Sequence, residues 1–343
     1  MNHTNPSAPD ANRASSEPLS ERQAISLGNW RALEAAAVGL SHLERNMPCQ
    51  DAVQAVAHGR AAAVLADGAG SSAASELGAK AVVHGLVRLL NTLEQTLIQL
   101  LDQPDYDEKA HKLFALLLVK HAVGILHNLA REQHLAVRDL RCTLLLAVCG
   151  TRRHLWLKVG DGAIIVERQL AQAPEDGPSS PLQLECKTVG TQGKGEFANQ
   201  THFLDEIKPH EVQIGHLDSY AITGLALMSD GAAERLVSND GAHVAKRLAA
   251  QLFALRAGKL RRSDLVRMFY EDGFCQNSTG DDRSLALLAR DYKTDQVEPE
   301  PTQSKPQAST ATPEPTPEPT PEPTPESIKQ RLHRYLLRYL SKK

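Results

Sequence analysis

The chain has 343 residues, of which 41% are hydrophobic and 23% are charged. This length and composition are typical of a soluble globular protein with one large domain or two small ones. The formal net charge is −3, and nucleic-acid-binding proteins usually carry an excess of Lys and Arg instead. A nucleic-acid partner is therefore not expected.

Cysteine usage and the apolar stretches bear on the compartment. The five cysteines are scattered and include no C-x-x-C pair, which favours free thiols over a disulfide framework or a zinc site. Residues 1–21 lack the apolar core of a signal peptide. The apolar stretch 113–130 is interrupted by Lys120, His121 and His127, so it predicts a buried helix rather than a membrane span. We expect a cytoplasmic protein.

Composition divides the chain into four zones. Residues 1–27 have the composition of a disordered tail, and residues 28–293 carry the strong hydrophobic periodicity. Residues 294–326 are a Pro/Glu/Thr-rich linker. Residues 327–343 predict a short basic helix. One folded domain, 28–293, is therefore expected.

Strand-length apolar runs recur through the large zone, and helical patterns interrupt them in pairs. The predicted strands are Arg31–Leu40, Ala61–Ala66, Thr143–Val148, His154–Val159, Ala163–Glu167, Leu182–Val189, Ala221–Met228 and Ser284–Ala289. The predicted helices are Ser72–Leu100, Asp107–Gln133, Ala242–Leu255 and Ser263–Tyr270. Strict strand–helix alternation is absent, so the order favours layered sheets with helices packed outside them over a doubly wound parallel sheet.

Aspartates stand at the ends of several predicted strands. Asp67, Asp161 and Asp230 each follow an apolar run and precede a glycine, and Asp281 and Asp282 come just before another run. Clustered carboxylates repel one another unless a hard cation neutralises them, and Mg²⁺ and Mn²⁺ take oxygen ligands. Two such ions can clamp a phosphate and lower the pKa of a bridging water. The pattern therefore indicates a two-metal phosphoester site.

Two other interpretations compete with the metal site. A single Asp-Gly after a strand is usually only a turn, although three of them together with an Asp-Asp pair make that reading weaker. The segment 68–73, Gly-Ala-Gly-Ser-Ser-Ala, also imitates a dinucleotide fingerprint. However, Asp67 would place negative charge beside the pyrophosphate, and no strand-end acid follows about 20 residues later.

Five short segments occur in the order found in a known family. They are Gln50-Asp51, Val64–Ser71, Val159–Asp161, Leu227–Gly231 and Gly280–Ser284. In this order they resemble the metal-dependent (PPM, type 2C) protein phosphatases, and Gly39–His42 with Pro48–Asp51 resembles the bacterial branch. The resemblance covers about residues 28–293. It implies an α+β fold, a four-layer αββα sandwich in which two antiparallel β-sheets are flanked by paired helices.

The resemblance also implies a set of metal ligands. Asp67 would bridge two Mn²⁺ or Mg²⁺ ions, and the backbone carbonyl of Gly68 would bind the second ion. Asp230 and Asp281 would complete the first metal site. Asp161, together with Asp230, would form a weaker third site.

The implied catalytic residues are Asp51, Asp67 and Asp230, with Asp51 acting on the metal site through water. Two positions depart from the family. The family often has a His after the bridging Asp-Gly, placed to protonate the leaving oxygen, but this chain has Ala69. The acid that precedes Asp51 in the family is replaced by Gln50, which can hold a water but carries no charge.

The substrate-binding residues are less well defined. The phosphate-gripping Arg of the family aligns near Asn46, so His42 and Arg45 are the candidates for contact with the substrate phosphate. A lone His or Arg near a motif is equally suited to a structural or a solvated position. Asp282 falls where the family often has Asn, and a supporting role is expected for it.

The implied function is metal-dependent hydrolysis of phosphoserine and phosphothreonine, with the targets of a Ser/Thr kinase as substrate partners. A pseudophosphatase that binds phosphoproteins without turnover is the alternative, and a hydrolase of another phosphoester would use the same residues. Asp67, Gly68, Asp230 and Asp281 are all present, which favours the enzyme because loss of a ligand is the direct way to lose the ion.

The C-terminal segment has its own pattern. In residues 327–343 six apolar side chains fall on one helical stripe, six Lys and Arg residues surround it, and no acid is present. A 17-residue helix is marginal alone in water, so the stripe needs a partner. A groove on another protein, an anionic membrane surface and the catalytic domain itself are the open alternatives, beside a frayed solubilising tail.

Overall fold

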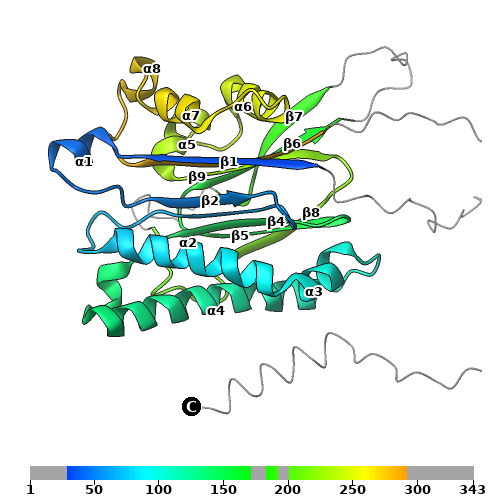
Figure 1. Cartoon of the computed structure of the whole chain (residues 1–343), viewed down its shortest axis with the longest axis horizontal. Helices are drawn as coiled ribbons and strands as arrows, with labels where there is room; N and C mark the ends of the chain where they lie inside the picture. The colour runs from blue at the N-terminus through cyan, green and yellow to red at the C-terminus, as the bar shows by residue number, and fades with distance from the viewer. Residues whose placement is uncertain (1–28, 171–182, 192–200, 292–343) are drawn as a thin grey trace, which may run out of the picture.

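The computed structural model describes residues 29–170, 183–191 and 201–291. Two five-stranded antiparallel sheets lie face to face, and helices cover the outer face of each sheet (Figure 1). The described residues form eight α-helices, so the predicted four-layer αββα sandwich is confirmed. The tail 1–27, the linker 294–326 and the basic segment 327–343 lie outside the described residues.

The first sheet has the strand order β1-β10-β9-β6-β7, and the second has the order β2-β3-β4-β5-β8. The strands of the first sheet are β1 (Trp30–Ala37), β6 (Ala163–Gln169), β7 (Leu184–Val189), β9 (Ile222–Met228) and β10 (Arg283–Arg290). Those of the second are β2 (Ala52–Val56), β3 (Ala62–Ala66), β4 (Leu144–Cys149), β5 (Arg153–Val159) and β8 (Gln213–Asp218).

Two helical layers enclose the sheets (Figure 1). The helices on the side of the second sheet are α2 (Ser75–Thr92), α3 (Glu94–Leu97) and α4 (Glu108–Gln133), with a π-helical turn at Ile98–Asp102 and a 3₁₀ turn at Val137–Leu140. Those on the side of the first sheet are α5 (Asp230–Leu236), α6 (Lys246–Arg256), α7 (Arg262–Phe269) and α8 (Asp272–Cys275). The short α1 (Leu40–Glu44) joins β1 to the loop before β2.

The central strands are apolar on both faces because each face meets another layer. In β3, Val64 packs toward α2 and α4, while its neighbours Ala63 and Leu65 pack between the sheets. Every residue of β3, β4, β9 and β10 is buried. Helix α4 is apolar enough to pass a membrane-span test by composition, yet it contributes Phe114 and Leu118, both fully buried, to the core against α2. This helix is therefore a core helix, as the sequence predicts.

Several predicted elements differ in extent. The single helix predicted over 72–100 is wrong, because α2 ends at Thr92 and the N–H of Leu93 closes the turn on the carbonyls of Leu89 and Leu90. The strand predicted as Arg31–Leu40 ends at Ala37, and Leu40 begins α1. Strands β2 and β8 were not predicted. Both are edge strands with half-buried residues, so they lack the apolar run that marks a central strand.

Candidate active site

The register of the first sheet gathers aspartates at one end of the sandwich. Met228 at the end of β9 pairs with Ala163 of β6 and with Leu285 of β10. The segments that enter or leave these strands therefore meet at this end. The aspartates that they carry are Asp161, Asp230 and Asp281.

The second sheet brings two more carboxylates to the same place. Ala52 pairs with Ala66, so Asp51 before β2 lies beside Asp67 after β3. Thr143 fixes the backbone at Asp67, because the amide of Asp67 donates to Thr143 Oγ1 at 2.9 Å and the amide of Thr143 donates to the Asp67 carbonyl at 2.8 Å. The sequence did not single out Thr143, since its hydroxyl acts on a residue 76 positions away.

Asp230 is held at the start of α5 by bonds between the ends of β9 and β10. The amide of Ser284 donates to Ser229 Oγ at 3.0 Å, and the amide of Ser229 donates to the Ser284 carbonyl at 3.2 Å. A Cβ at Gly231 would lie 2.2 Å from the carbonyl oxygen of Asp282, so only glycine permits α5 to begin this close to β10. The Asp-Gly sequence at this position therefore serves close packing.

The electrostatics confirm that the five carboxylates face one another. The pKa of Asp67 is raised well above its ordinary value, first by burial and then by the negative charges of Asp51, Asp230, Asp281 and Asp161. Burial together with the charges of Asp161 and Asp281 also raises the pKa of Asp230 to about 6. Burial and neighbouring carboxylates are thus what raises the pKa of both Asp67 and Asp230.

Asp51 is the most enclosed of the catalytic candidates. Its residue is 4% exposed, and burial raises its pKa to about 8. The negative charges of Asp282 and Asp230 add to this shift in the pKa of Asp51. An Asp with this pKa is protonated at neutral pH unless a cation lies nearby.

The donor set fits hard divalent cations. Both carboxylate oxygens of Asp51, Oδ1 of Asp230 and Oε1 of Gln50 are buried without a hydrogen-bond partner. Buried polar atoms of this kind point to an ion or water that belongs in the site. No three His, Cys, Asp or Glu side chains in the described ranges converge tightly enough to hold an ion by themselves. Mg²⁺-type sites meet this description, because they keep several waters and use one or two carboxylates.

Gly68 lies where the chain passes close to the segment before Asp51. It forms an isolated bridge with Cys142, and a Cβ there would lie 2.8 Å from both the carbonyl oxygen of Gln50 and the Cβ of Ser75. Only glycine therefore fits at position 68, because any side chain would clash with these two atoms. The metal-binding role of the Gly68 carbonyl stays a prediction.

Asp161 lies in the turn between β5 and β6 and has neighbours that the sequence did not reveal. Thr201 Oγ1 donates to Asp161 Oδ2 at 2.7 Å, and Gly160 supplies the required positive φ of +105°. Lys158 is 1% exposed, and its Nζ donates to the carbonyl of Thr191 at 2.8 Å. Burial lowers the pKa of Lys158 to about 8, and the charge of Asp161 opposes the shift. The sequence signal that could have revealed this contact is the position of Lys158 inside the apolar run of the predicted strand His154–Val159.

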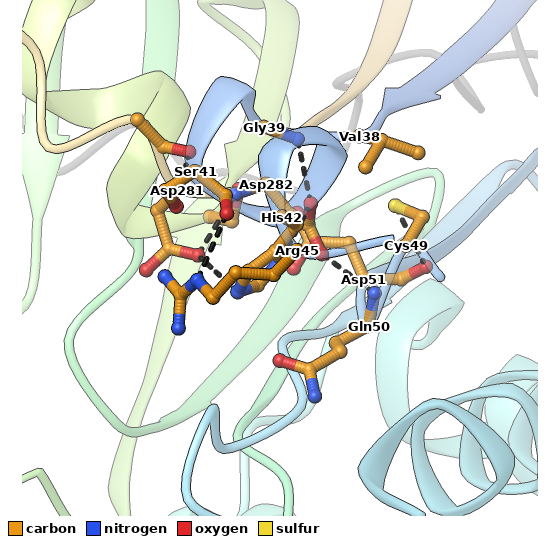
Figure 2. Close-up of polar contacts among 12 residues, drawn as sticks. Val38, Gly39, Ser41, His42, Arg45, Cys49, Gln50, Asp51, Asp281 and Asp282 are labelled. Atoms are coloured by element: carbon orange, nitrogen blue, oxygen red, sulfur yellow. Dashed lines mark hydrogen bonds and ion pairs between the residues drawn. The ribbon is translucent and has the colours of Figure 1, made fainter. Parts of the chain in front are cut away.

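The structure separates the two predicted phosphate contacts (Figure 2). His42 is 5% exposed, and its Nδ1 lies 3.0 Å from Asp282 Oδ1. Arg45 directly follows α1 and is exposed, and its Nε donates to the carbonyl of Ser41 at 2.9 Å. Only Arg45 therefore presents its side chain to solvent, and the substrate role of either residue stays a prediction.

The comparisons with known proteins agree with this geometry. The sequence matches the family profile of Protein phosphatase 2C over residues 38–268. The chain belongs to this family. The matched range contains Asp51, Asp67, Asp161 and Asp230, whereas the position of Asp281 in the site rests on the register of β10.

Members of the Protein phosphatase 2C family from bacteria are among the relatives. Serine/threonine-protein phosphatase 3 of Escherichia coli (strain K12) is 26% identical over 275 residues, which cover 76% of this chain and 98% of that protein. A variant of a bacterial serine phosphatase of known structure has a TM-score of 0.50 and 15% identity, over 77% of this chain and 98% of that one. The catalytic domain of the phosphatase PstP, solved with 2 manganese ions, has a TM-score of 0.48 and 17% identity over 76% of this chain and 97% of that one.

Proposed function

We propose that this protein is a cytoplasmic, metal-dependent phosphatase that hydrolyses phosphoserine and phosphothreonine in proteins. The observation that supports the proposal most is the convergence of four other carboxylates on Asp67, whose pKa is raised by burial and by their negative charges. Such a cluster is stable in its charged form only with cations bound. Family membership and the relationship to serine/threonine phosphatases support the choice of substrate.

The side chains divide the work in the proposed reaction. Asp67, Asp230 and Asp281 hold two Mn²⁺ or Mg²⁺ ions with the Gly68 carbonyl, and Asp161 contributes to a weaker third site. The ions, when bound, lower the pKa of a water and neutralise the phosphate that it attacks.

Two further parts of the reaction involve residues around this ligand set. Asp51 presents two buried carboxylate oxygens without partners, so it is placed to accept hydrogen bonds from waters of the site. Arg45 offers an exposed guanidinium for the substrate phosphate. Ala69 has no proton to give, so we assign the protonation of the leaving oxygen to no side chain.

The test compares the wild type with Asp230→Asn in hydrolysis of a phosphothreonine peptide with added Mn²⁺. We expect metal-dependent turnover in the wild type and a loss of about 100-fold or more in the variant, because a direct ligand is expected to matter at least as much as the outer partners of metal sites. Asp240→Asn, which changes an exposed aspartate between α5 and α6, is the matched control and keeps full activity.

A wild type that binds Mn²⁺ in calorimetry but releases no phosphate from the peptide would overturn the enzymatic proposal. That result would favour the pseudophosphatase. Turnover of a small aryl phosphate without turnover of the peptide would instead favour a hydrolase of another phosphoester.

A further inference from the structure

Asp282 connects three distant parts of the site. Its side chain is 2% exposed, and its Oδ1 accepts a hydrogen bond from the amide of Gly39 at 2.7 Å. Its Oδ2 accepts from the amide of Gln50 at 2.6 Å. These partners are 243 and 232 residues away in the sequence. The carboxylate therefore fixes the start of α1, and the residue before Asp51, against the start of β10.

The turn that carries Asp281 packs directly on α1. The amide and the hydroxyl of Ser41 both donate to the carbonyl of Gly280, at 2.9 Å and 2.7 Å. A Cβ at Gly39 would lie 2.2 Å from the carbonyl carbon of Asp281, so the two backbones touch at this point. The position of α1 and the position of Asp281 are thus set together.

His42 lies between the two aspartates of this turn (Figure 2). Its Nδ1 is 3.0 Å from Asp282 Oδ1 and its Nε2 is 3.8 Å from Asp281 Oδ1, both within ion-pair distance, although Nδ1 has no partner of hydrogen-bond geometry. The amide of Asp282 also donates to Asp281 Oδ1, at 2.8 Å. One oxygen of Asp281 is therefore held from the protein side, while the side chain as a whole remains 45% exposed.

We infer that His42 is a positioning residue for the metal site: with Asp282 it orients the carboxylate of Asp281 toward a divalent cation, and it does not contact the substrate. The inference rests on the proposed function, because it assigns Asp281 to a metal. A ligand carboxylate that is held by neighbouring groups loses less conformational freedom when the ion binds. The pair therefore raises the affinity for the ion rather than for the phosphoprotein.

The burial of His42 argues against contact with the substrate. Its side chain is 6% exposed, and both of its ring nitrogens face carboxylates. A phosphate that approached these nitrogens would meet the negative charges of Asp281 and Asp282. Arg45, which directly follows α1, is exposed and suits a phosphate better.

The experiment measures Mn²⁺ affinity by calorimetry without substrate, and KM for p-nitrophenyl phosphate at saturating Mn²⁺, both on the full-length protein. His42→Phe keeps a ring in the buried space but removes both nitrogens. We expect its Mn²⁺ affinity to fall about 10- to 100-fold with KM unchanged, as found for outer partners of metal ligands. In His42→Asn the amide nitrogen takes the place of Nδ1 beside Asp282, so most of the affinity returns.

Arg45→Ala, at the residue that directly follows α1, is the matched control, and we expect it to raise KM without changing Mn²⁺ affinity. A higher KM with unchanged Mn²⁺ affinity in His42→Phe would overturn the inference and return His42 to the substrate. If His42→Phe changes neither Mn²⁺ affinity nor KM, the inference is overturned as well. Because calorimetry measures Mn²⁺ affinity without substrate, it tests the role of His42 even if the wild type has no turnover. Failure of the proposed function is therefore distinguishable from failure of this inference. If His42→Phe does not fold, as judged by circular dichroism, His42→Ala takes its place.

Discussion

Buried charge is handled in opposite ways in two regions of the molecule. Under α6, Glu167 is 0% exposed and pairs with Arg256, and it also accepts a hydrogen bond from Thr223 Oγ1 at 2.7 Å. At the active-site end, Asp51 and Asp67 face further carboxylates, and both oxygens of Asp51 have no hydrogen-bond partner. In the first arrangement a carboxylate meets a cationic side chain, although Glu167 Oε1 has no hydrogen-bond partner, whereas in the second the carboxylates face one another.

Arg60 is a further buried charge that is paired with opposite charges, as Glu167 is. Arg60 forms ion pairs with Glu94 at 2.8 Å and Asp102 at 2.6 Å, and it donates to the carbonyl of Cys149 at 2.9 Å. These ion pairs anchor the start of α3 and the end of the π-helical turn after it to the loop between β2 and β3. The comparison teaches that a buried carboxylate paired with an arginine is structural in this fold, whereas a group of buried carboxylates that face one another marks the place of a cation.

The largest effect is expected from breaking the balanced region. Glu167→Gln removes the carboxylate that pairs with the buried guanidinium of Arg256, so the free energy of unfolding should fall by about 3–5 kcal/mol. Urea unfolding followed by circular dichroism measures it. The control is Glu185→Gln, whose partner Arg168 is in a more exposed pair and whose loss should leave the midpoint nearly unchanged. Equal effects of the two variants would contradict the comparison.

At the active-site end, removal of a buried negative charge should raise the free energy of unfolding instead of lowering it. The native pKa of Asp51, about 8, lies above its ordinary value of 3.8, so the native state keeps a proton that the unfolded state loses. The stability of the metal-free protein therefore falls as pH rises through this window. Asp51→Asn removes the penalty and should stabilise the metal-free protein at pH 7 by about 2–4 kcal/mol, at about 1.4 kcal/mol per pKa unit.

Urea unfolding in the presence of a chelator, repeated from pH 4 to pH 8, measures this gain. The gain should be near zero at pH 4, where the carboxyl group is protonated, and should grow as pH rises. A destabilised Asp51→Asn protein at pH 7 would show that the carboxylate is compensated within the chain.

The smallest expected effect is on the pH dependence of stability and comes from a buried histidine that stays neutral. His154 is 1% exposed, and burial lowers its pKa from 6.5 to about 3, with the charge of Arg290 contributing. Below pH 6.5 the unfolded state binds a proton that the native state does not, so stability falls as pH falls. Between pH 7 and pH 5 this amounts to about 2 kcal/mol.

His154→Gln should remove that part of the pH dependence, and the difference between the unfolding curves of variant and wild type isolates it from the other titrating groups. His127→Gln, a change at an exposed histidine of α4, is the control and keeps the wild-type slope. A slope that survives in His154→Gln would show that another group causes it.

Much of the fold was predictable from the sequence because the central strands are apolar on both faces. The predicted runs at 61–66, 143–148 and 284–289 coincide with β3, β4 and β10 to within a residue or so at each end. Strands β2 and β8 were missed because edge strands have mixed burial. The break at Leu93 was missed because both sides of it have helical periodicity.

The candidate site was predictable to the level of its carboxylates. Asp51, Asp67, Asp161, Asp230 and Asp281 each stand beside a strand, and the structure brings all five together. Their roles at the metals remain predictions. The groups that hold them were not visible: Thr143, Thr201 and Lys158 act through single contacts with residues far along the chain, or with a loop carbonyl.

The sequence by itself determined which segments form the layers and where the acidic residues interrupt them, because both follow from local patterns of apolar and polar residues. Only the tertiary structure decided what each polar side chain near the site does. His42 in α1 and Arg45 directly after it are three residues apart, yet His42 is buried against Asp282 and Arg45 is exposed. The physical reason is that Asp282 reaches His42 through the pairing of β1 with β10, across about two thirds of the chain, and local periodicity carries no record of that pairing.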